Sequence, residues 1–340
     1  MSSSGVVYPA QPEKILKALG QVWTSLAKEE QQHQKPTVLR ACAMTLIVAT
    51  DDTDGDQGTA LQTLIGLMHE HPSRSVVLRV SETVERGLEA RVLAQCWKPF
   101  GKAQQICCEQ IEISAHPQSW AQVGPTVNGI LAADLPVVLW CRQKAALNPA
   151  ASDEQKTGLA AVMDFAGKAI VDTAGSDLRG AYQVIKKWRQ QGRIIGDLQW
   201  TRLTPWRQAL ANAFDDPGKQ RDILRYKSVE VGYAGADPDA AILYIAGWLS
   251  AVLDAHASLV RLDVGQGTGL QRVTLRSDTD EITLQRTSDQ CMTLRVGGRQ
   301  RKYTYSELSL YTLMNEELSI LGPDPVFESA IERALEIHQA

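Results

Sequence analysis

Apolar and polar positions alternate along the first part of the chain in a pattern that predicts strands and helices in turn. A continuous apolar run at 38–50 predicts a central strand that is buried on both faces. Residues 13–30 repeat their apolar positions at helical spacing. The same patterns predict further strands at 73–80, 88–97, 106–115 and 135–141, and helices at 57–71 and 119–131. Strands that alternate with helices indicate a mostly parallel sheet covered by helices.

A polar segment at 147–158 interrupts this alternation. It is rich in Asn, Pro, Ala, Ser and charged residues, which is typical of an exposed connection between two domains. After it, the pattern predicts a second α/β stretch, with strands at 169–172 and 222–233 and a helix at 176–190. The apolar run at 240–253 predicts a buried helix, because it is too short to span a bilayer.

The last third of the chain consists of short alternating runs, which predict an antiparallel meander. These runs lie at 259–264, 272–276, 281–286, 292–296 and 301–305, and helices are predicted after them at 306–321 and 325–338. We therefore expect an α/β protein of two domains. Residues 1–150 form an N-terminal α/β domain with a mixed or parallel sheet and flanking helices. Residues 159–340 form a C-terminal α+β domain with the antiparallel meander and the terminal helices.

The composition is that of a globular protein and argues against two classes of partner. The chain has 35 Lys and Arg against 39 Asp and Glu, a net charge of −4, and it shows no strongly basic stripe. Nucleic acid is therefore not expected as a partner. The polar N-terminal residues 1–12 lack the features of a signal peptide, and no run is long enough to cross a membrane. We expect a cytoplasmic protein without a membrane partner.

The six cysteines lie mostly in apolar, strand-like runs, which predicts free and buried thiols. No Cys-x-x-Cys spacing occurs, so the sequence signals neither a zinc site nor a thioredoxin-like motif. Cys107 and Cys108 are the one pair with a redox interpretation. Neighbouring residues on a strand point to opposite faces, so a bridge between them would be strained and labile. The alternatives are this thiol switch and two unpaired thiols.

Three further patterns invite a ligand interpretation that their spacing does not support. The Gly-rich run 264–269 follows a predicted strand, but a second strand follows it, where a phosphate loop requires a helix. The acidic run 51–56 lacks the Gly and the Glu of a calcium loop. His69 and His71 lack the spacing that places two ligands on one helix face. We therefore expect no metal, no cofactor and no catalytic set.

The run at 196–210 is the most informative part of the chain. It places two Trp and two Arg around a predicted helix start, where Thr204 caps the helix and Pro205 occupies its first turn. Trp and Arg together are typical of a binding hot spot. In one interpretation the segment is packed in the core and its Arg side chains cap local carbonyls. In the other, Trp200, Arg202 and Arg207 face a partner while Trp206 packs inward.

A second candidate contact is the turn between the predicted helix at 57–71 and the strand that follows. His71 and Arg74 flank Pro72 and Ser73 there. The functional interpretation is an anion contact or an interface contact. The structural alternative is a hydrogen-bonded turn.

Three segments together resemble the OpcA family of glucose-6-phosphate dehydrogenase assembly proteins. They are the Trp-Thr-Arg-Leu-Thr-Pro-Trp-Arg run at 200–207, the Leu-Pro-Val-Val-Leu-Trp run at 135–140 and His-Pro-Ser-Arg at 71–74. The resemblance covers residues 38–253, and the first run is its most specific part. Some members of that family are thiol-regulated, and the resemblance assigns their cysteines to no position of this chain.

The resemblance implies a non-enzymatic assembly factor and allosteric activator. Its partner would be glucose-6-phosphate dehydrogenase, whose active oligomer it would promote, raising NADPH production in the pentose phosphate pathway. The candidate partner-binding residues are Trp200, Arg202, Thr204, Trp206 and Arg207, with His71 and Arg74. The alternatives are a sugar-phosphate-binding enzyme, with the His71 and Arg74 turn as its anion site, and a metabolite sensor in the same pathway.

Overall fold

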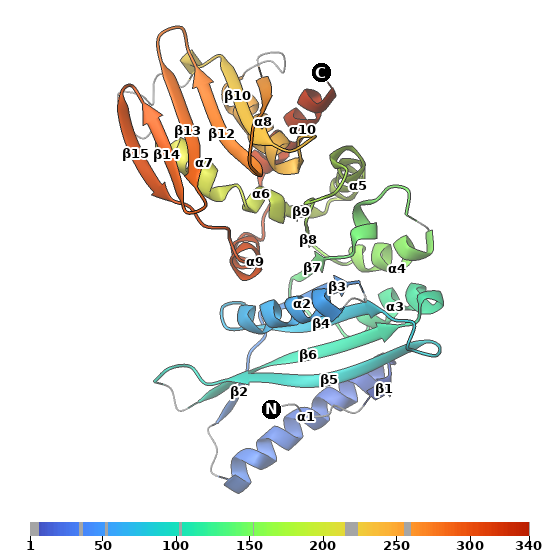
Figure 1. The fold of residues 1–340 in the computed structure, drawn as a ribbon. Helices are drawn as coiled ribbons and strands as arrows, with labels where there is room; N and C mark the ends of the chain where they lie inside the picture. Colours follow the sequence, from blue (N-terminus) through green and yellow to red (C-terminus); the bar gives the residue numbers. More distant parts are fainter. Residues whose placement is uncertain are drawn as a thin grey trace. The chain divides into compact units, whose positions relative to one another are not determined.

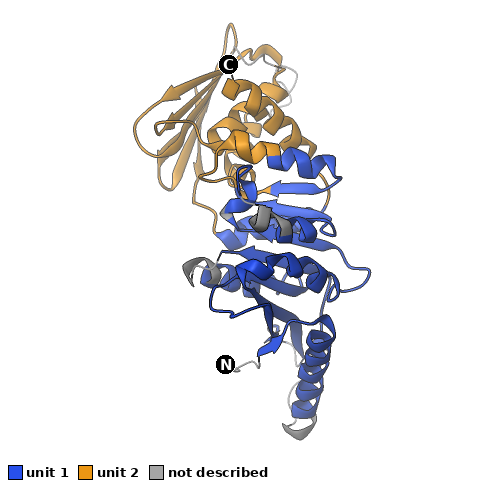
Figure 2. Ribbon diagram, turned by 90° about the vertical axis from the view of Figure 1, so that its right-hand side faces the viewer, with its two compact units in different colours: residues 1–172, 184–196, 310–321 blue, residues 173–183, 197–309, 322–340 orange. Residues whose placement is uncertain are grey.

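The computed structural model describes residues 7–33, 37–51, 54–101, 104–151, 153–214, 224–254 and 260–339. The chain forms two compact units, shown in different colours in Figure 2. The first unit comprises residues 1–172, 184–196 and 310–321, and the second comprises 173–183, 197–309 and 322–340. The predicted fold class is confirmed, because a mixed sheet with flanking helices and an antiparallel meander with a terminal helix are both present (Figure 1).

Within the described residues, the first sheet has nine strands, in the order β1-β5-β6-β4-β3-β7-β8-β9, with β2 also paired to β6. Strands β3, β4, β6, β7 and β8 run parallel, while β1 and β5 form an antiparallel edge. The strands are β1 (Val7–Pro9), β2 (Val38–Arg40), β3 (Met44–Thr50), β4 (Ser73–Val80), β5 (Leu88–Trp97), β6 (Gln105–Ala115), β7 (Val137–Cys141), β8 (Lys168–Val171) and β9 (Ile194–Asp197).

Every residue of the central strand β3 is buried, as expected for a strand covered on both faces. The predicted strand at 38–50 is nevertheless wrong in its first part. Residues 38–40 form the separate strand β2, which pairs with β6, whereas β3 pairs with β4 and β7. Helix α1 packs against β5, and α2 packs against β3.

The helices of the first unit follow the apolar periodicity with one exception. Helix α4 lies where the polar composition predicts a connection, and residues 147–158 belong to the first unit. Its apolar residues Leu159, Val162 and Met163 are buried. The elements are α1 (Pro12–His33), α2 (Asp54–Leu67), η1 (Pro117–Gln122), α3 (Val123–Asn128), η2 (Lys144–Leu147), α4 (Asp153–Met163) and α9 (Leu310–Ser319), and α5 (Leu178–Gln190) has residues in both units.

Helix α9 belongs to the first unit, although the sequence predicts that it closes the C-terminal meander. Its end is held by Lys168 on β8, a buried side chain whose Nζ donates to the Glu317 carboxylate at 2.8 Å and to the Ile320 carbonyl at 2.6 Å. A buried ammonium needs such partners. At the start of the helix, Tyr311 donates to Glu70 at 2.7 Å. These contacts attach α9 to the first unit rather than to the meander.

The second unit contains a six-stranded sheet over its described residues, in the order β11-β10-β12-β13-β14-β15. Strands β12 to β15 form the predicted antiparallel meander, while β11 runs parallel to β10. One face carries buried apolar residues, among them Val273, Leu275, Ile282 and Leu284. The strands are β10 (Ser228–Ala234), β11 (Val260–Val264), β12 (Gly269–Arg276), β13 (Glu281–Ser288), β14 (Cys291–Val296) and β15 (Arg299–Thr304).

The predicted buried helix at 240–253 is helix α8 (Ala240–Val252), which packs against α10 (Pro325–Gln339). The two helices approach closely at Gly247, where a Cβ atom would clash with the Ala330 carbonyl oxygen and lie 2.6 Å from the Ala334 nitrogen. None of the helices that the structure describes is long and apolar enough to cross a membrane.

Candidate functional site

The Trp and Arg run forms two short helices directly after strand β9. These are α6 (Leu198–Thr201) and α7 (Thr204–Ala211), with Arg202 and Leu203 between them. The prediction that Thr204 caps the second helix is wrong, because Leu203 holds the N-cap position and Thr204 is the first helical residue. Pro205 lies in the first turn, as predicted. We call residues 197–207 the Trp/Arg segment.

A fully buried carboxylate anchors the start of the Trp/Arg segment. Asp197 accepts hydrogen bonds from the Thr173 hydroxyl at 2.7 Å and from the Tyr244 hydroxyl at 2.8 Å. It also accepts one from the backbone N–H of Gln199 at 2.9 Å, which caps α6. These donors compensate the loss of hydration of the charge. Asp197 is thus a positioning residue to which the sequence patterns gave no role.

The Trp200 ring lies inside an aromatic cluster and is 3% exposed. Its indole N–H donates to the Asp324 carboxylate at 2.9 Å. The ring centroid lies 6.5 Å from that of Tyr244 and 5.7 Å from that of Phe327, which are distances typical of favourable aromatic pairs. Trp200 therefore supports the segment from within rather than presenting its ring at the surface.

Arg207 covers the outer face of this cluster. Its guanidinium carbon lies 3.7 Å from the centroid of the Trp200 ring, and one terminal nitrogen donates to the Thr204 hydroxyl at 2.9 Å. Stacking on an aromatic face holds the planar cation in one orientation. Because Arg207 is only partly buried, the charge is pre-oriented at the surface of the second unit.

Trp206 points inward and is 2% exposed, with its ring 6.3 Å from that of Tyr305 in an edge-to-face arrangement. Arg202 is half-buried, and its guanidinium donates to the side-chain oxygen of Gln199 at 2.8 Å. The segment thus places both Trp rings inside the unit and both Arg side chains partly at its surface. The buried Trp rings agree with the first interpretation and not with a Trp200 ring that faces a partner, and a partner contact through Arg202 and Arg207 stays a prediction.

His71 and Arg74 belong to the first unit and serve a different local network. Arg74 is 6% exposed, and its guanidinium donates to the Glu109 carboxylate at 2.7 Å and to the Ile130 carbonyl at 2.7 Å. Arg40 pairs with the same carboxylate at 2.8 Å. His71 shares a hydrogen bond with Asn315 on α9 at 2.8 Å. Arg74 therefore stabilises the interior of the sheet, and a partner contact at this turn stays a prediction.

The structure corrects the prediction of a free thiol at Cys107. Cys107 forms a disulfide bond with Cys96, to which it lies directly opposite on the neighbouring strands β5 and β6. Cys108 points elsewhere and donates to the Ala41 carbonyl at 3.4 Å. The strained bridge between Cys107 and Cys108 does not form. The spacing of the cysteines along the chain does not predict this pairing, because the pairing depends on the register of two strands.

Cys42, Cys108, Cys141 and Cys291 are free, as predicted for most of the thiols. Burial raises the pKa of the Cys108 thiol to about 11 and that of the Cys141 thiol to about 12. A raised pKa keeps the thiol protonated at neutral pH, and the protonated form is a poor nucleophile. The reactive fraction of these two thiols therefore rises only as the pH approaches these values.

We expect a chromogenic disulfide reagent at pH 8 to label the half-buried Cys42 and Cys291 before unfolding, and Cys108 and Cys141 only after it. Raising the pH from 7 to 9 leaves the two buried thiols slow, because both pKa values lie above that range. The Cys108→Ser and Cys141→Ser variants identify the signals. Fast labelling of Cys108 in the native protein would contradict the assignment.

The structure describes part of the other ligand patterns of the sequence. The Gly-rich run joins β11 to β12, so a strand follows it, as the pattern predicts. The acidic run 51–56 lies partly outside the described residues. Within the part of the chain that the structure describes, no group of three or more His, Cys, Asp or Glu side chains is placed to hold a metal ion.

Two family models match consecutive stretches, and both describe domains of a subunit of glucose-6-phosphate dehydrogenase. The N-terminal domain model matches residues 66–185, and the C-terminal domain model matches residues 193–331. The chain belongs to the OpcA family of glucose-6-phosphate dehydrogenase subunits, which confirms the predicted resemblance.

Cyanobacterial relatives carry the provisional name OxPP cycle protein OpcA. The relative from Nostoc punctiforme is 25% identical over 284 residues, which are 73% of this chain and 58% of the relative. The relative from Synechocystis is 27% identical over 192 residues, which are 54% of this chain and 37% of the relative. The chain spans about half the length of the curated relatives that it matches.

Solved structures show only a distant similarity. Glucose-6-phosphate 1-dehydrogenase from Mycobacterium avium aligns with a TM-score of 0.48 at 11% identity, over 87% of this chain and 91% of the enzyme. An oxidoreductase from Sinorhizobium meliloti aligns with a TM-score of 0.49 at 10% identity, over 88% and 96% of the two chains. Neither value supports a functional comparison.

Proposed function

We propose that this chain is a non-catalytic subunit that binds glucose-6-phosphate dehydrogenase and activates it by favouring its active oligomer. The observation that carries the proposal is that both family models, which together span residues 66–185 and 193–331, describe a subunit of that dehydrogenase. In this proposal the protein acts in the cytoplasm and raises the output of NADPH.

The Trp/Arg segment is the proposed contact surface. Arg207 is held on the Trp200 ring and Arg202 is held by Gln199. Binding of a partner would therefore cost little side-chain conformational entropy. Arginine is enriched in interface hot spots because its planar guanidinium binds carboxylates through two parallel hydrogen bonds. We expect the partner to present carboxylates or carbonyl oxygens to this surface.

Activation by such a subunit follows from a difference in affinity. If the chain binds one conformation or oligomer of the dehydrogenase more tightly than another, it shifts the population toward that state. The shift is limited by the ratio of the two affinities. No catalytic group of this chain is needed for that effect.

Size-exclusion chromatography with light scattering tests the association. The purified chain and the dehydrogenase from the same organism should elute together, with a mass that exceeds that of either alone. Separate elution at micromolar concentrations of both proteins contradicts the proposal. The chain alone is assayed with sugar phosphates in parallel, because turnover without the dehydrogenase would favour an enzyme.

A further inference from the structure

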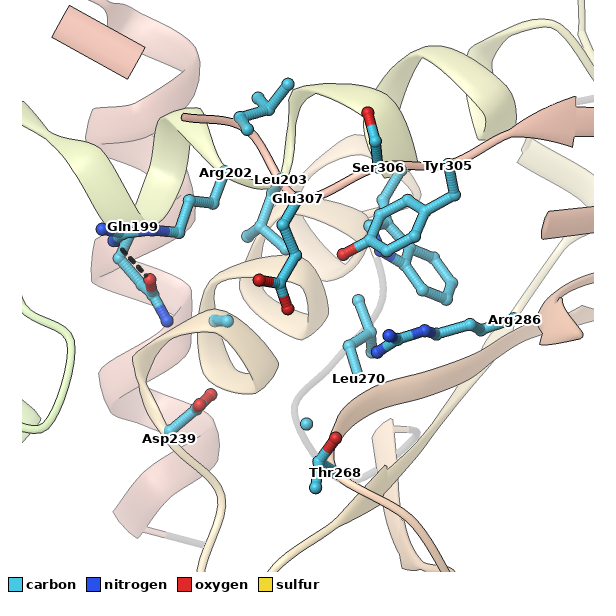
Figure 3. A pocket seen from close by; sticks show the side chains of 14 residues that line it. Gln199, Arg202, Leu203, Asp239, Thr268, Leu270, Arg286, Tyr305, Ser306 and Glu307 are labelled. Carbon is cyan, nitrogen blue, oxygen red and sulfur yellow. Dashed lines mark hydrogen bonds between the residues drawn. The ribbon is translucent and has the colours of Figure 1, made fainter. Parts of the chain in front are cut away.

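A cavity of about 370 Å³ lies in the second unit beside the Trp/Arg segment (Figure 3). Its lining comes from stretches that are far apart in the sequence: the Trp/Arg segment with parts of α6 and α7, the start of α8, the start of β12 and the residue before it, strand β13 and the residues after β15. The volume lies at the small end of the range for small-molecule sites. A single metabolite therefore fits the cavity better than a dinucleotide does.

Arg286 on β13 provides a positive charge that reaches into the cavity (Figure 3). Its side chain is 15% exposed, and its guanidinium carbon lies 5.2 Å from the centroid of the Tyr305 ring, which supports it from one side. One terminal nitrogen pairs with Asp289 at 2.8 Å, but that carboxylate is almost fully exposed and the pair is screened by water. A guanidinium carries five N–H donors, so Arg286 retains donors for an anion.

The opposite side of the cavity offers hydrogen-bond acceptors as well as donors. Figure 3 shows the Glu307 carboxylate pointing into the cavity and the Asp239 carboxylate at its edge, with Gln199 and Arg202 beside them. Carboxylates only accept hydrogen bonds, so a ligand that contacts them must donate. Both carboxylate side chains are exposed, and Asp239 also accepts the backbone N–H of Ile242 at 3.1 Å as the N-cap of α8. Hydroxyl groups meet that requirement, and a phosphate next to the same carboxylates does not.

The floor of the cavity is apolar. Leu203, Trp206 and Leu270 line it, and all three are buried. The Tyr305 hydroxyl points from the wall toward the open space (Figure 3). An apolar floor with a few convergent polar groups is typical of a small-molecule site. The C–H face of a sugar ring matches this floor.

We propose that this cavity binds a phosphorylated sugar. Arg286 donates to the phosphate, the Tyr305 hydroxyl bonds to the sugar, and Glu307 and Asp239 accept hydrogen bonds from sugar hydroxyls. The combination of the Arg286 guanidinium with the two carboxylates carries this assignment, since the ligand must combine an acceptor-only anion with donating hydroxyls. The site lies within one unit and requires no partner protein.

Isothermal titration calorimetry on the isolated full-length chain tests the proposal. Glucose 6-phosphate should bind saturably, while glucose and inorganic phosphate should each bind about tenfold more weakly or worse, because each lacks one set of contacts. Absence of saturable binding of glucose 6-phosphate overturns the proposal. Inorganic phosphate that binds as tightly as the sugar phosphate also overturns it, because the cavity would then be an anion site without a sugar subsite.

Two variants and one control locate the binding. Arg286→Gln should weaken binding about tenfold or more, and Tyr305→Phe, which keeps the ring that supports Arg286, about twofold to tenfold. Arg295→Gln removes an exposed charge on β14 outside the cavity and should leave the affinity unchanged. Melting temperatures establish that each variant is folded. If Arg286→Gln is unfolded, the affinity of the Tyr305→Phe variant tests the assignment instead. Unchanged affinity in the folded variants overturns the assignment. Because the dehydrogenase is absent, this result is independent of the proposed activation.

Discussion

Replacing Trp206 with alanine should lower the free energy of unfolding of this protein by about 3–5 kcal/mol, the usual cost of truncating a buried Trp. The side chain is 2% exposed, and its ring packs edge-to-face against Tyr305. Alanine leaves a cavity that the surrounding helix α7 and the residues after β15 do not fill. Urea denaturation followed by circular dichroism measures the loss.

Trp97→Ala is a suitable control for this measurement. Trp97 lies on strand β5 of the first unit, is only half-buried and stacks on His69 with a centroid distance of 4.8 Å. Its truncation removes less buried area and should cost less. A loss below about 1 kcal/mol for Trp206→Ala, a value typical of surface positions, would show that the ring does not support the second unit.

The Arg202→Ala and Arg207→Ala variants should remain folded and bind the dehydrogenase more weakly by about 2–5 kcal/mol, if each makes a buried charge-assisted contact with it. This corresponds to about a 30-fold or larger rise in the concentration that gives half-maximal activation. Arg207 also loses its stacking on Trp200, which lowers the stability of the chain by only about 0.5–2 kcal/mol. The two effects are separated by recording melting temperature and half-saturation for each variant.

Arg142 offers a matched control for Arg207. Its guanidinium carbon lies 5.0 Å from the centroid of the Trp140 ring, but it belongs to the first unit. Arg142→Ala removes the same kind of stacked cation and should leave activation of the dehydrogenase unchanged. If the folded Arg202→Ala and Arg207→Ala variants activate with unchanged half-saturation, the Trp/Arg segment is not the contact surface.

The sequence predicts the elements that follow from local periodicity. The burial of strand β3 follows from its continuous apolar run, and the inward position of Trp206 follows from its helical spacing to Leu210. The orientation of Arg207 does not follow, because it depends on the break between α6 and α7 that brings its guanidinium over the Trp200 ring. Local patterns therefore locate the segment but not the geometry of its charges.

Contacts between distant residues account for what the sequence did not predict. Asp197 acquires its role from Thr173 and Tyr244, which lie 24 and 47 residues away. Lys168 holds helix α9 through Glu317, which lies 149 residues away. The Cys96–Cys107 bond depends on the register of β5 against β6. Side-chain periodicity specifies which face is buried, but it does not specify which distant partner meets that face.

The initial rate of NADP⁺ reduction by glucose-6-phosphate dehydrogenase, measured against increasing concentrations of this chain, shows directly whether the chain activates the enzyme. The dehydrogenase comes from the same organism and is held at a concentration where its oligomer is partly dissociated. We expect a saturable rise in rate with the wild-type chain, which Arg207→Ala reaches only at about 30-fold or higher concentration. A rate that stays unchanged at every concentration of the folded wild-type chain would contradict the proposed activation.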